Sequence, residues 1–118
     1  KAAEQGHAEA QNNLGLMYDH WRGVERDFVQ ARKLYLKAAK QGHANAQYNL
    51  ALLYTNGQGV PQDDIEAYVW ANISAAQGFS TLAKDLRDKL RRILGPTCIS
   101  KAQAHAQAYF EKYVVPFQ

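Results

Sequence analysis

The sequence has little of three features that would point to particular classes of protein. It holds a single cysteine, Cys98, which cannot form an intramolecular disulfide, so the redox compartment stays open. It has only three prolines, all at plausible breaks between helices, which favours a mostly helical chain. No stretch approaches the roughly 18 consecutive apolar residues that a membrane-spanning helix needs. We therefore expect a helical domain with neither a disulfide framework nor a membrane span.

Charge of one sign is also scarce. The formal net charge is +3, from 14 basic and 11 acidic residues. Lysines and arginines are scattered, apart from a local run over 84–92, so the sequence lacks the extended basic face that is typical of nucleic-acid binding. We expect no nucleic-acid partner. A length of 118 residues leaves room for one domain with one continuous core.

The sequence contains an internal repeat, in which one segment occurs twice with few changes. KAAEQGHAEAQNNLGLMYDHWRG begins at position 1 and KAAKQGHANAQYNLALLYTNGQG at position 37, which is a period of 36 residues (37 − 1). Periods of this length are typical of stacked helical repeats. A third, weaker copy keeps the register through Ala75, Gly78, Leu86 and Gly95. We place the repeats at 6–41, 42–77 and 78–113, with 1–5 as the end of a preceding repeat and 114–118 as a tail.

Each repeat is predicted to be a pair of antiparallel helices. In the second copy Ala46, Leu50 and Leu53 have helical spacing, and a turn follows over 56–61. Asp63 and Glu66 then have the spacing of a capping box, which opens the second helix of the pair. The other helices are expected over 7–20, from the N-cap at 27 to 41, over 80–93 and over 97–113.

Two residues of the first copy allow separate predictions about a helix end and a turn. Gly6 occupies the same repeat position as Gly42, so we expect a helix to end just before Gly6. Trp21 stands where the second copy has Gly57. We expect the first turn to have another shape, because Trp tolerates a left-handed backbone poorly.

The last predicted helix has the composition of a terminal cap. Ile99, Ala102 and Ala106 share one side of it, whereas the other side is largely polar. A polar outer face is what the end of a repeat array requires. The tail over 114–118 is expected to fold back on the core.

The second copy resembles the SEL-one-like repeat family, which is related to the tetratricopeptide repeats. The matching residues are Ala39, Gly42, Ala46, Leu50, Ala51, Tyr54, Gly57, Gly59, Val60, Asp63, Ala67, Trp70, Ala75 and Ala76. The match spans nearly the whole chain. The resemblance implies an all-α fold, a right-handed α-α superhelix in which the first helix of each repeat lines a concave face. It also implies an adaptor that assembles complexes at membranes, in secretion and envelope pathways, or in the degradation of misfolded proteins.

The resemblance bears on location as well. Bacterial members of the family are frequently exported or periplasmic, which favours a periplasmic or secreted protein by analogy. Because 1–3 repeats the text that ends a helix at 37–39, we expect an earlier repeat, and any signal segment, to lie upstream of Lys1.

Residues that carry chemistry in other proteins are not expected to converge here. His7 and His43 occupy one repeat position, and equivalent positions of stacked helices lie about 10 Å apart. That spacing is too wide for a zinc ion, whose ligands lie about 2 Å from the metal. Cys98 and His105 are two helical turns apart without a third partner, so Cys98 is expected to be a small packing group. We expect no metal, no cofactor and no catalytic site, and thus no enzyme.

Residues that differ between repeats on the first-helix face are the candidates for binding a partner. They are Asn12, Leu16, Asn45, Tyr48, Leu52, Lys84, Asp88, Arg91 and Arg92. Asparagine amides pair well with a peptide backbone, and Arg91 with Arg92 suits a carboxylate. Tyr48 is expected to anchor an apolar group. The same row also suits a solvated helix face, and this alternative stays open.

The expected function is that of an adaptor or scaffold whose concave groove binds a protein or peptide. One alternative is a structural scaffold that uses its convex face or its open N-terminal end. The other is a β-lactam-binding enzyme like the cysteine-rich members of the family. Their paired cysteines are lacking here, and Thr81-x-x-Lys84 is only a loose echo of the Ser-x-x-Lys motif.

Overall fold

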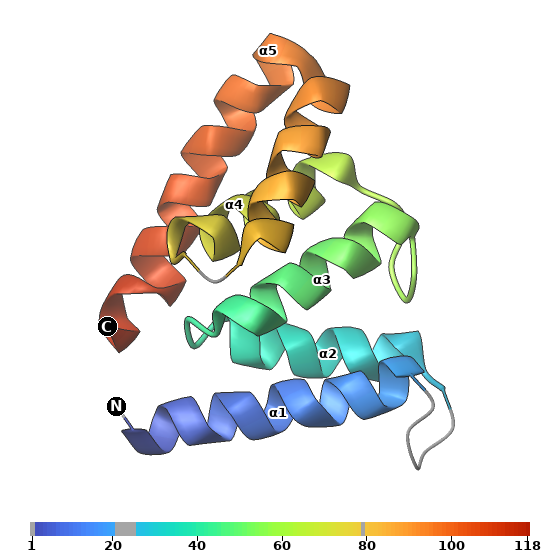
Figure 1. Cartoon of the computed structure of the whole chain (residues 1–118), viewed down its shortest axis with the longest axis vertical. Helices are drawn as coiled ribbons and strands as arrows, with labels where there is room; N and C mark the ends of the chain where they lie inside the picture. Colours follow the sequence, from blue (N-terminus) through green and yellow to red (C-terminus); the bar gives the residue numbers. More distant parts are fainter. Residues whose placement is uncertain (1, 21–25, 79) are drawn as a thin grey trace.

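The computed structural model describes residues 2–20, 26–78 and 80–118, which form five α-helices, one 3₁₀ helix and no strand. The helices are α1 (Ala2–His20), α2 (Phe28–Ala39), α3 (Ala44–Asn56), α4 (Asp64–Ala76) and α5 (Thr81–Tyr113), followed by η1 (Val115–Phe117). Each helix packs against the next along the chain (Figure 1). The predicted all-α repeat fold is confirmed. Lys1 and the turn expected around Trp21 lie outside the described residues.

The same hydrogen bonds shape the turn of both complete repeats. Asp27 and Asp63 are 36 positions apart, and each carboxylate accepts from two backbone N–H groups in the first turn of its helix. The backbone N–H of each aspartate donates to the carbonyl of a matching tyrosine, Tyr18 or Tyr54, at 3.0 Å. Both predicted N-caps are therefore confirmed, and the sequence period is also a period of hydrogen bonding.

The capping box predicted at Asp63 forms only in part. Its second half would be a bond from the backbone N–H of Asp63 to the side chain of Glu66. That N–H already donates to the carbonyl of Tyr54, and Glu66 instead accepts a hydrogen bond from the hydroxyl of Tyr109 at 3.3 Å. Glu66 thus joins α4 to α5 and does not close the turn.

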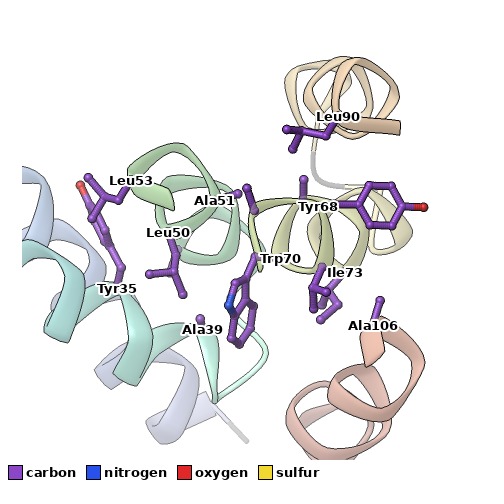
Figure 2. Close-up of a cluster of buried hydrophobic side chains, with 14 of the residues drawn as sticks. Tyr35, Ala39, Leu50, Ala51, Leu53, Tyr68, Trp70, Ile73, Leu90 and Ala106 are labelled. Carbon is purple, nitrogen blue, oxygen red and sulfur yellow. The ribbon is translucent and has the colours of Figure 1, made fainter. Parts of the chain in front are cut away.

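The core is a set of alanine-rich helix faces with a few large side chains between them. Tyr35, Leu50, Tyr68 and Trp70 are almost completely buried, with relative exposures of 0 to 2%. Figure 2 shows how they come from α2, α3 and α4 in succession. Alanines fully buried against them are Ala31, Ala38, Ala39, Ala46, Ala51, Ala67 and Ala71. Small residues let neighbouring helices approach closely, and the large ones fill the remaining space.

The helix end expected at Gly6 is wrong. α1 runs without interruption from Ala2 to His20, and Gly6 is not among the glycines with positive φ. Gly42 and Gly78 occupy the same repeat position, have φ of +83° and +68°, and do follow the ends of α2 and α4. Glycine permits a left-handed turn without imposing one, and inside a helix it costs only about 1 kcal/mol. The repeat limits proposed above remain predictions.

α5 consists of two helical arms joined at Gly95. The backbone of Gly95 is not helical (φ 79°, ψ 170°), and the two arms form a hairpin at the top of Figure 1. The first arm begins after the N-cap Ser80, whose hydroxyl accepts from a backbone N–H. In the second arm Ile99, Ala102 and Ala106 are buried, as their spacing predicted. The two predicted helices of the third repeat are confirmed.

The tail folds back on the core, as predicted. Val114 is 1% exposed, and Phe117 lies against the α2–α3 turn. A Cβ added to Gly42 in that turn would be 3.2 Å from the carbonyl oxygen of Tyr113 and 3.5 Å from the Cβ of Phe117. The end of α5 therefore reaches the junction between the first two repeats (Figure 1).

In the described parts of the chain, none of the helices combines the length and the apolar character that crossing a membrane requires.

Candidate binding face

A row of glutamine pairs holds the helices of each repeat in register. The side-chain N–H of Gln41 donates to the amide oxygen of Gln11 at 2.8 Å, and that of Gln77 donates to Gln47 at 2.6 Å. Gln47 also donates to the carbonyl of Ala39 at 3.0 Å, so it joins the second repeat to the last turn of α2. These repeated bonds fix the positions from which the variable side chains project.

Asn12 lies inside the molecule and not on the exposed face where the sequence placed it. It is 1% exposed, and its amide oxygen accepts from the side chain of Asn49 at 3.0 Å. Asn49 also donates to Asn45 at 3.2 Å. The three amides join α1 to α3, because a buried amide needs hydrogen-bond partners. Asn12 is therefore not available to a partner, and Asn45 is half-buried.

Tyr48 lies between α3 and α5, as Asn12 lies between α1 and α3. Its position is 36 residues after Asn12, and Asp85 is 36 residues after Asn49. Burial raises the pKa of the Tyr48 hydroxyl, and the negative charge of Asp85 raises it further. Tyr48 thus contributes to the junction between the second and third repeats, while part of its side chain remains exposed.

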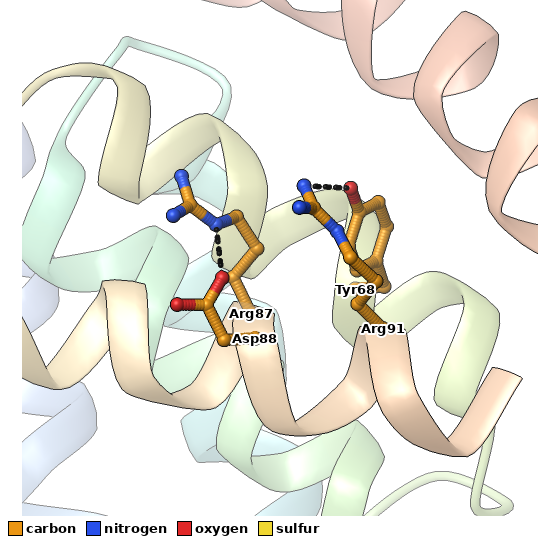
Figure 3. Close-up of polar contacts among 4 residues, drawn as sticks. All are labelled: Tyr68, Arg87, Asp88 and Arg91. Atoms are coloured by element: carbon orange, nitrogen blue, oxygen red, sulfur yellow. Dashed lines mark hydrogen bonds and ion pairs between the residues drawn. The ribbon is translucent and has the colours of Figure 1, made fainter. Parts of the chain in front are cut away.

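The charged candidates of α5 differ in their contacts. Arg91 donates to the hydroxyl of Tyr68 on α4 at 3.4 Å, and Asp88 is paired with Arg87 at 3.1 Å (Figure 3). Hydrogen bonding to Tyr68 raises the pKa of Arg91. Lys84 and Arg92 are exposed. Arg91 is exposed as well, although its guanidinium is directed towards α4 by the bond to Tyr68.

A depression of about 390 Å³ lies at the bend of α5. It is lined by Arg91, Arg92, Gly95, Pro96 and Ile99, and most of its surface is apolar. The sequence indicated the two arginines as binding residues but indicated Gly95 and Pro96 only as a helix break. The sequence signal for this site is that Gly95 and Pro96 closely follow Arg91 and Arg92. A Gly-Pro bend interrupts the helix, and here it does so beside charged side chains. The remaining candidates, Leu16 and Leu52, are half-buried.

A second cavity, of about 330 Å³, lies where the tail meets the first two repeats. Glu9, His43, Gln77 and Phe117 are among its lining residues. The Nδ1 of His43 accepts from the backbone N–H of Ala46 at 3.1 Å and so caps α3. Burial lowers the pKa of His43, an effect that the charge of Glu9 partly opposes. His43 thus begins α3, whereas its repeat counterpart, His7, lies within α1.

Other reactive side chains lie apart from these cavities. Cys98 is half-buried in the second arm of α5, and His105 packs edge-on against Tyr109 with ring centroids 4.3 Å apart. Among the residues that the structure describes, no three His, Cys, Asp or Glu side chains are grouped closely enough to hold a metal ion. Thr81 and Lys84 both lie exposed at the start of α5.

Stacked antiparallel helix pairs, with the same capping and glutamine hydrogen bonds in successive units, define a helical-repeat protein. The model of the Sel1 repeat matches residues 8–43 and 44–79, so the chain belongs to the Sel1 repeat family. A search of curated proteins gave no match.

Several solved structures are similar to this chain, among them the following two. One is a protective antigen present in uropathogenic Escherichia coli strains, which displays an SLR fold; it is 32% identical with a TM-score of 0.88. That match covers 96% of this chain and 24% of the antigen. The other is a Sel1 repeat protein from Oxalobacter formigenes, 39% identical with a TM-score of 0.65, over 70% of this chain and 34% of that protein. The chain thus spans about a quarter to a third of these relatives.

Proposed function

We propose that this chain is a protein-interaction module that binds a partner segment across the face of α1, α3 and the first arm of α5. It acts by binding and not by catalysis. One observation carries the proposal. The glutamines that join the two helices of each complete repeat, Gln11 and Gln47, are identical after 36 positions, whereas the candidates on this face differ in at least one copy. At one such position the three copies have Leu16, Leu52 and Asp88.

The chemistry of the face indicates the partner. Lys84 and Arg92 are exposed cations, and the depression at the bend offers an apolar surface beside the guanidinium groups. A guanidinium binds a carboxylate with two directed hydrogen bonds. The favoured partner is therefore a peptide segment in which an apolar side chain lies next to an acidic one. Leu52 adds a half-buried apolar contact on the neighbouring helix.

Selection from a random peptide library tests the proposal. We expect the selected peptides to combine acidic and apolar residues and to bind at least about tenfold more weakly to Arg92→Glu, because a charge-assisted hydrogen bond is worth about 1.5–3 kcal/mol. Lys101→Glu, an exposed site on the second arm of α5, is the matched control and should leave affinity unchanged. Equal losses in both variants, or peptides without acidic residues, would contradict the proposal.

A further inference from the structure

The cavity beside the tail gathers polar side chains from several elements. It lies where α1 and the α2–α3 turn meet the end of α4 and the tail. Its volume of about 330 Å³ is within the range of small-molecule sites, which is about 300–1,000 Å³. The polar side chains whose contacts define its chemistry are those of Glu9, Gln41, His43 and Gln77.

The amides of Gln41 and Gln77 leave their oxygen atoms available. Each Nε2 donates to its paired glutamine, Gln11 or Gln47, and to the backbone carbonyl four residues earlier, at 2.6 to 3.4 Å. Because a backbone carbonyl only accepts, these bonds also fix which end of each amide is the nitrogen. An amide nitrogen has two N–H groups, so both are used. Neither Oε1 has a donor among the residues that the structure describes, and both side chains line the cavity.

The charges around the cavity favour a cation. Among the described residues that line it, Glu9 is the only one with a charged side chain at neutral pH. His43 is neutral there, since burial lowers its pKa. Gln41 and Gln77 follow the C-terminal ends of α2 and α4, where the helix dipoles contribute partial negative charge. The start of α3 also borders the cavity, but its N–H groups are capped by the Nδ1 of His43.

Apolar groups complete the lining. Val114 is buried, and Phe117 is half-buried against the α2–α3 turn. Ala8 and Ala44 add small apolar surfaces. The cavity therefore combines one carboxylate and two amide oxygens with an aromatic side chain.

We infer that this cavity binds a primary ammonium group that carries a short apolar portion. The three N–H groups of an ammonium suit the carboxylate of Glu9 and the amide oxygens of Gln41 and Gln77. The apolar portion would lie against Phe117. A free small amine and the N-terminal residue of a peptide both offer this chemistry. The site is separate from the proposed peptide-binding face, so the inference does not depend on the proposed function.

A nuclear magnetic resonance titration of the isotope-labelled chain with phenethylamine tests the inference at neutral pH, where the amine is charged. We expect saturable shifts at the amides of Gly42, His43 and Gln77, with a dissociation constant of about 1 mM or less. Phenethyl alcohol lacks the charge and hydrocinnamate reverses it, so both should bind at least about tenfold more weakly. The trimethylammonium analogue keeps the charge without an N–H group and should also bind more weakly than phenethylamine.

Glu9→Gln removes the negative charge and keeps the size of the side chain. It should weaken phenethylamine binding by about fivefold, because Glu9 is exposed and water partly screens its charge. Glu111→Gln is the matched control, since it makes the same change at an exposed site of α5 that does not line the cavity. It should leave the affinity unchanged, and circular dichroism should show that both variants are folded.

A tripeptide with a free N-terminal phenylalanine, and the same peptide acetylated, distinguish the two sources of the ammonium group. Binding of the free peptide that acetylation abolishes would assign the site to peptide N-termini, whereas binding of phenethylamine alone would assign it to small amines. Absence of saturable binding by both would overturn the inference. Equal affinity for phenethyl alcohol, shifts confined to residues outside the cavity, or equal losses in Glu9→Gln and Glu111→Gln would overturn it as well.

Discussion

Gly15 and Ala51 occupy the same repeat position, and an aromatic ring packs close to the backbone of Gly15. A Cβ on Gly15 would lie 2.7 Å from Cε1 of Tyr35. In the second repeat the positions of Gly15 and Tyr35 are taken by Ala51 and Ala71, both fully buried. The glycine thus accompanies the large aromatic residue of the first repeat, whereas the second repeat has a small side chain at both positions. The hydroxyl of Tyr35 donates to Asp19 at 2.8 Å, which fixes the ring in place.

Gly15→Ala should therefore destabilise the protein by about 1–3 kcal/mol, the usual cost of overpacking a core. Chemical denaturation followed by circular dichroism measures the change. Gly6→Ala is the control in the same helix: nothing lies within 4 Å of its added Cβ, so stability should rise by up to about 1 kcal/mol. Similar effects at both sites would show that Tyr35 moves aside freely.

His43 makes the stability depend on pH. Its folded pKa lies below the ordinary value because of burial, so as pH falls through about 6.5 the unfolded chain takes up a proton before the folded chain does. Protonation also removes the acceptor that caps α3. Stability should fall as pH drops below that value, and His43→Asn should flatten the fall, because Asn caps a helix without titrating. Denaturation midpoints across this range test the prediction, with His7→Asn as a control that removes no cap.

At single residues the sequence was a partial guide to the binding face. It indicated that positions 12 and 48 lie on the same side of their helices, and they do occupy equivalent junctions. It did not show that Asn49 would bury Asn12 in an amide pair, because that contact joins side chains from different repeats. Exposure at a repeat junction depends on what the neighbouring repeat supplies.

Among the elements, α5 depends most on a single backbone conformation. Gly95 has φ 79° and ψ 170°, a region that is almost closed to residues with a Cβ. The bend brings the second arm against α4, where Trp70 and Tyr109 pack with ring centroids 5.1 Å apart. The angle between the arms thus governs both the aromatic contact and the depression beside Arg92.

Gly95→Ala should cost about 1–3 kcal/mol through backbone strain alone, since nothing lies within 4 Å of its added Cβ. Near-ultraviolet circular dichroism of Trp70 should change at the same time, because the arm that carries Tyr109 shifts. Pro96→Ala is the control, since it alters the same bend without forcing a positive φ. An unchanged aromatic spectrum in Gly95→Ala would mean that the bend is held by packing and not by glycine.

The helices themselves were predictable because their signals are local. Asp27 and Asp63 give the starts of α2 and α4, and the Gly95-Pro96 pair gives the break in α5. The wrong prediction of a helix end at Gly6 arose because this feature is not determined locally. Whether a glycine ends a helix depends on the competition between helix continuation and the next element, and one sequence position does not settle that competition.

For the molecule as a whole, the tail connects the end of α5 to the α2–α3 turn, two regions that the repeat pattern alone would not bring together. Val114 is buried, and the segment closes one side of the 330 Å³ cavity beside His43. The period of the sequence predicted the array of helix pairs, because every repeat makes similar contacts. It did not predict the cavities: one is closed by the tail, which lies outside the repeats, and the other lies at the Gly95-Pro96 bend of the degenerate third copy.

Deletion of 114–118 should lower the free energy of unfolding by at least about 1.5 kcal/mol, the value of burying one valine. Hydrogen exchange should accelerate at the backbone amides of the α2–α3 turn around Gly42, far from the deletion in sequence. Val115→Ala, at a half-exposed site in the same segment, should change neither quantity appreciably. Protection at Gly42 that survives the deletion would show that the turn is stable without its cover.

The contact between Phe117 and Gly42 also imposes an order on folding during synthesis. The ribosome releases the chain from its N-terminus, so α1 to α4 can pair with their neighbours as they emerge. The α2–α3 turn must wait, uncovered, until Val114 and Phe117 have been made. A nascent chain would therefore complete these local helix pairs before the junction between α2 and α3 is covered.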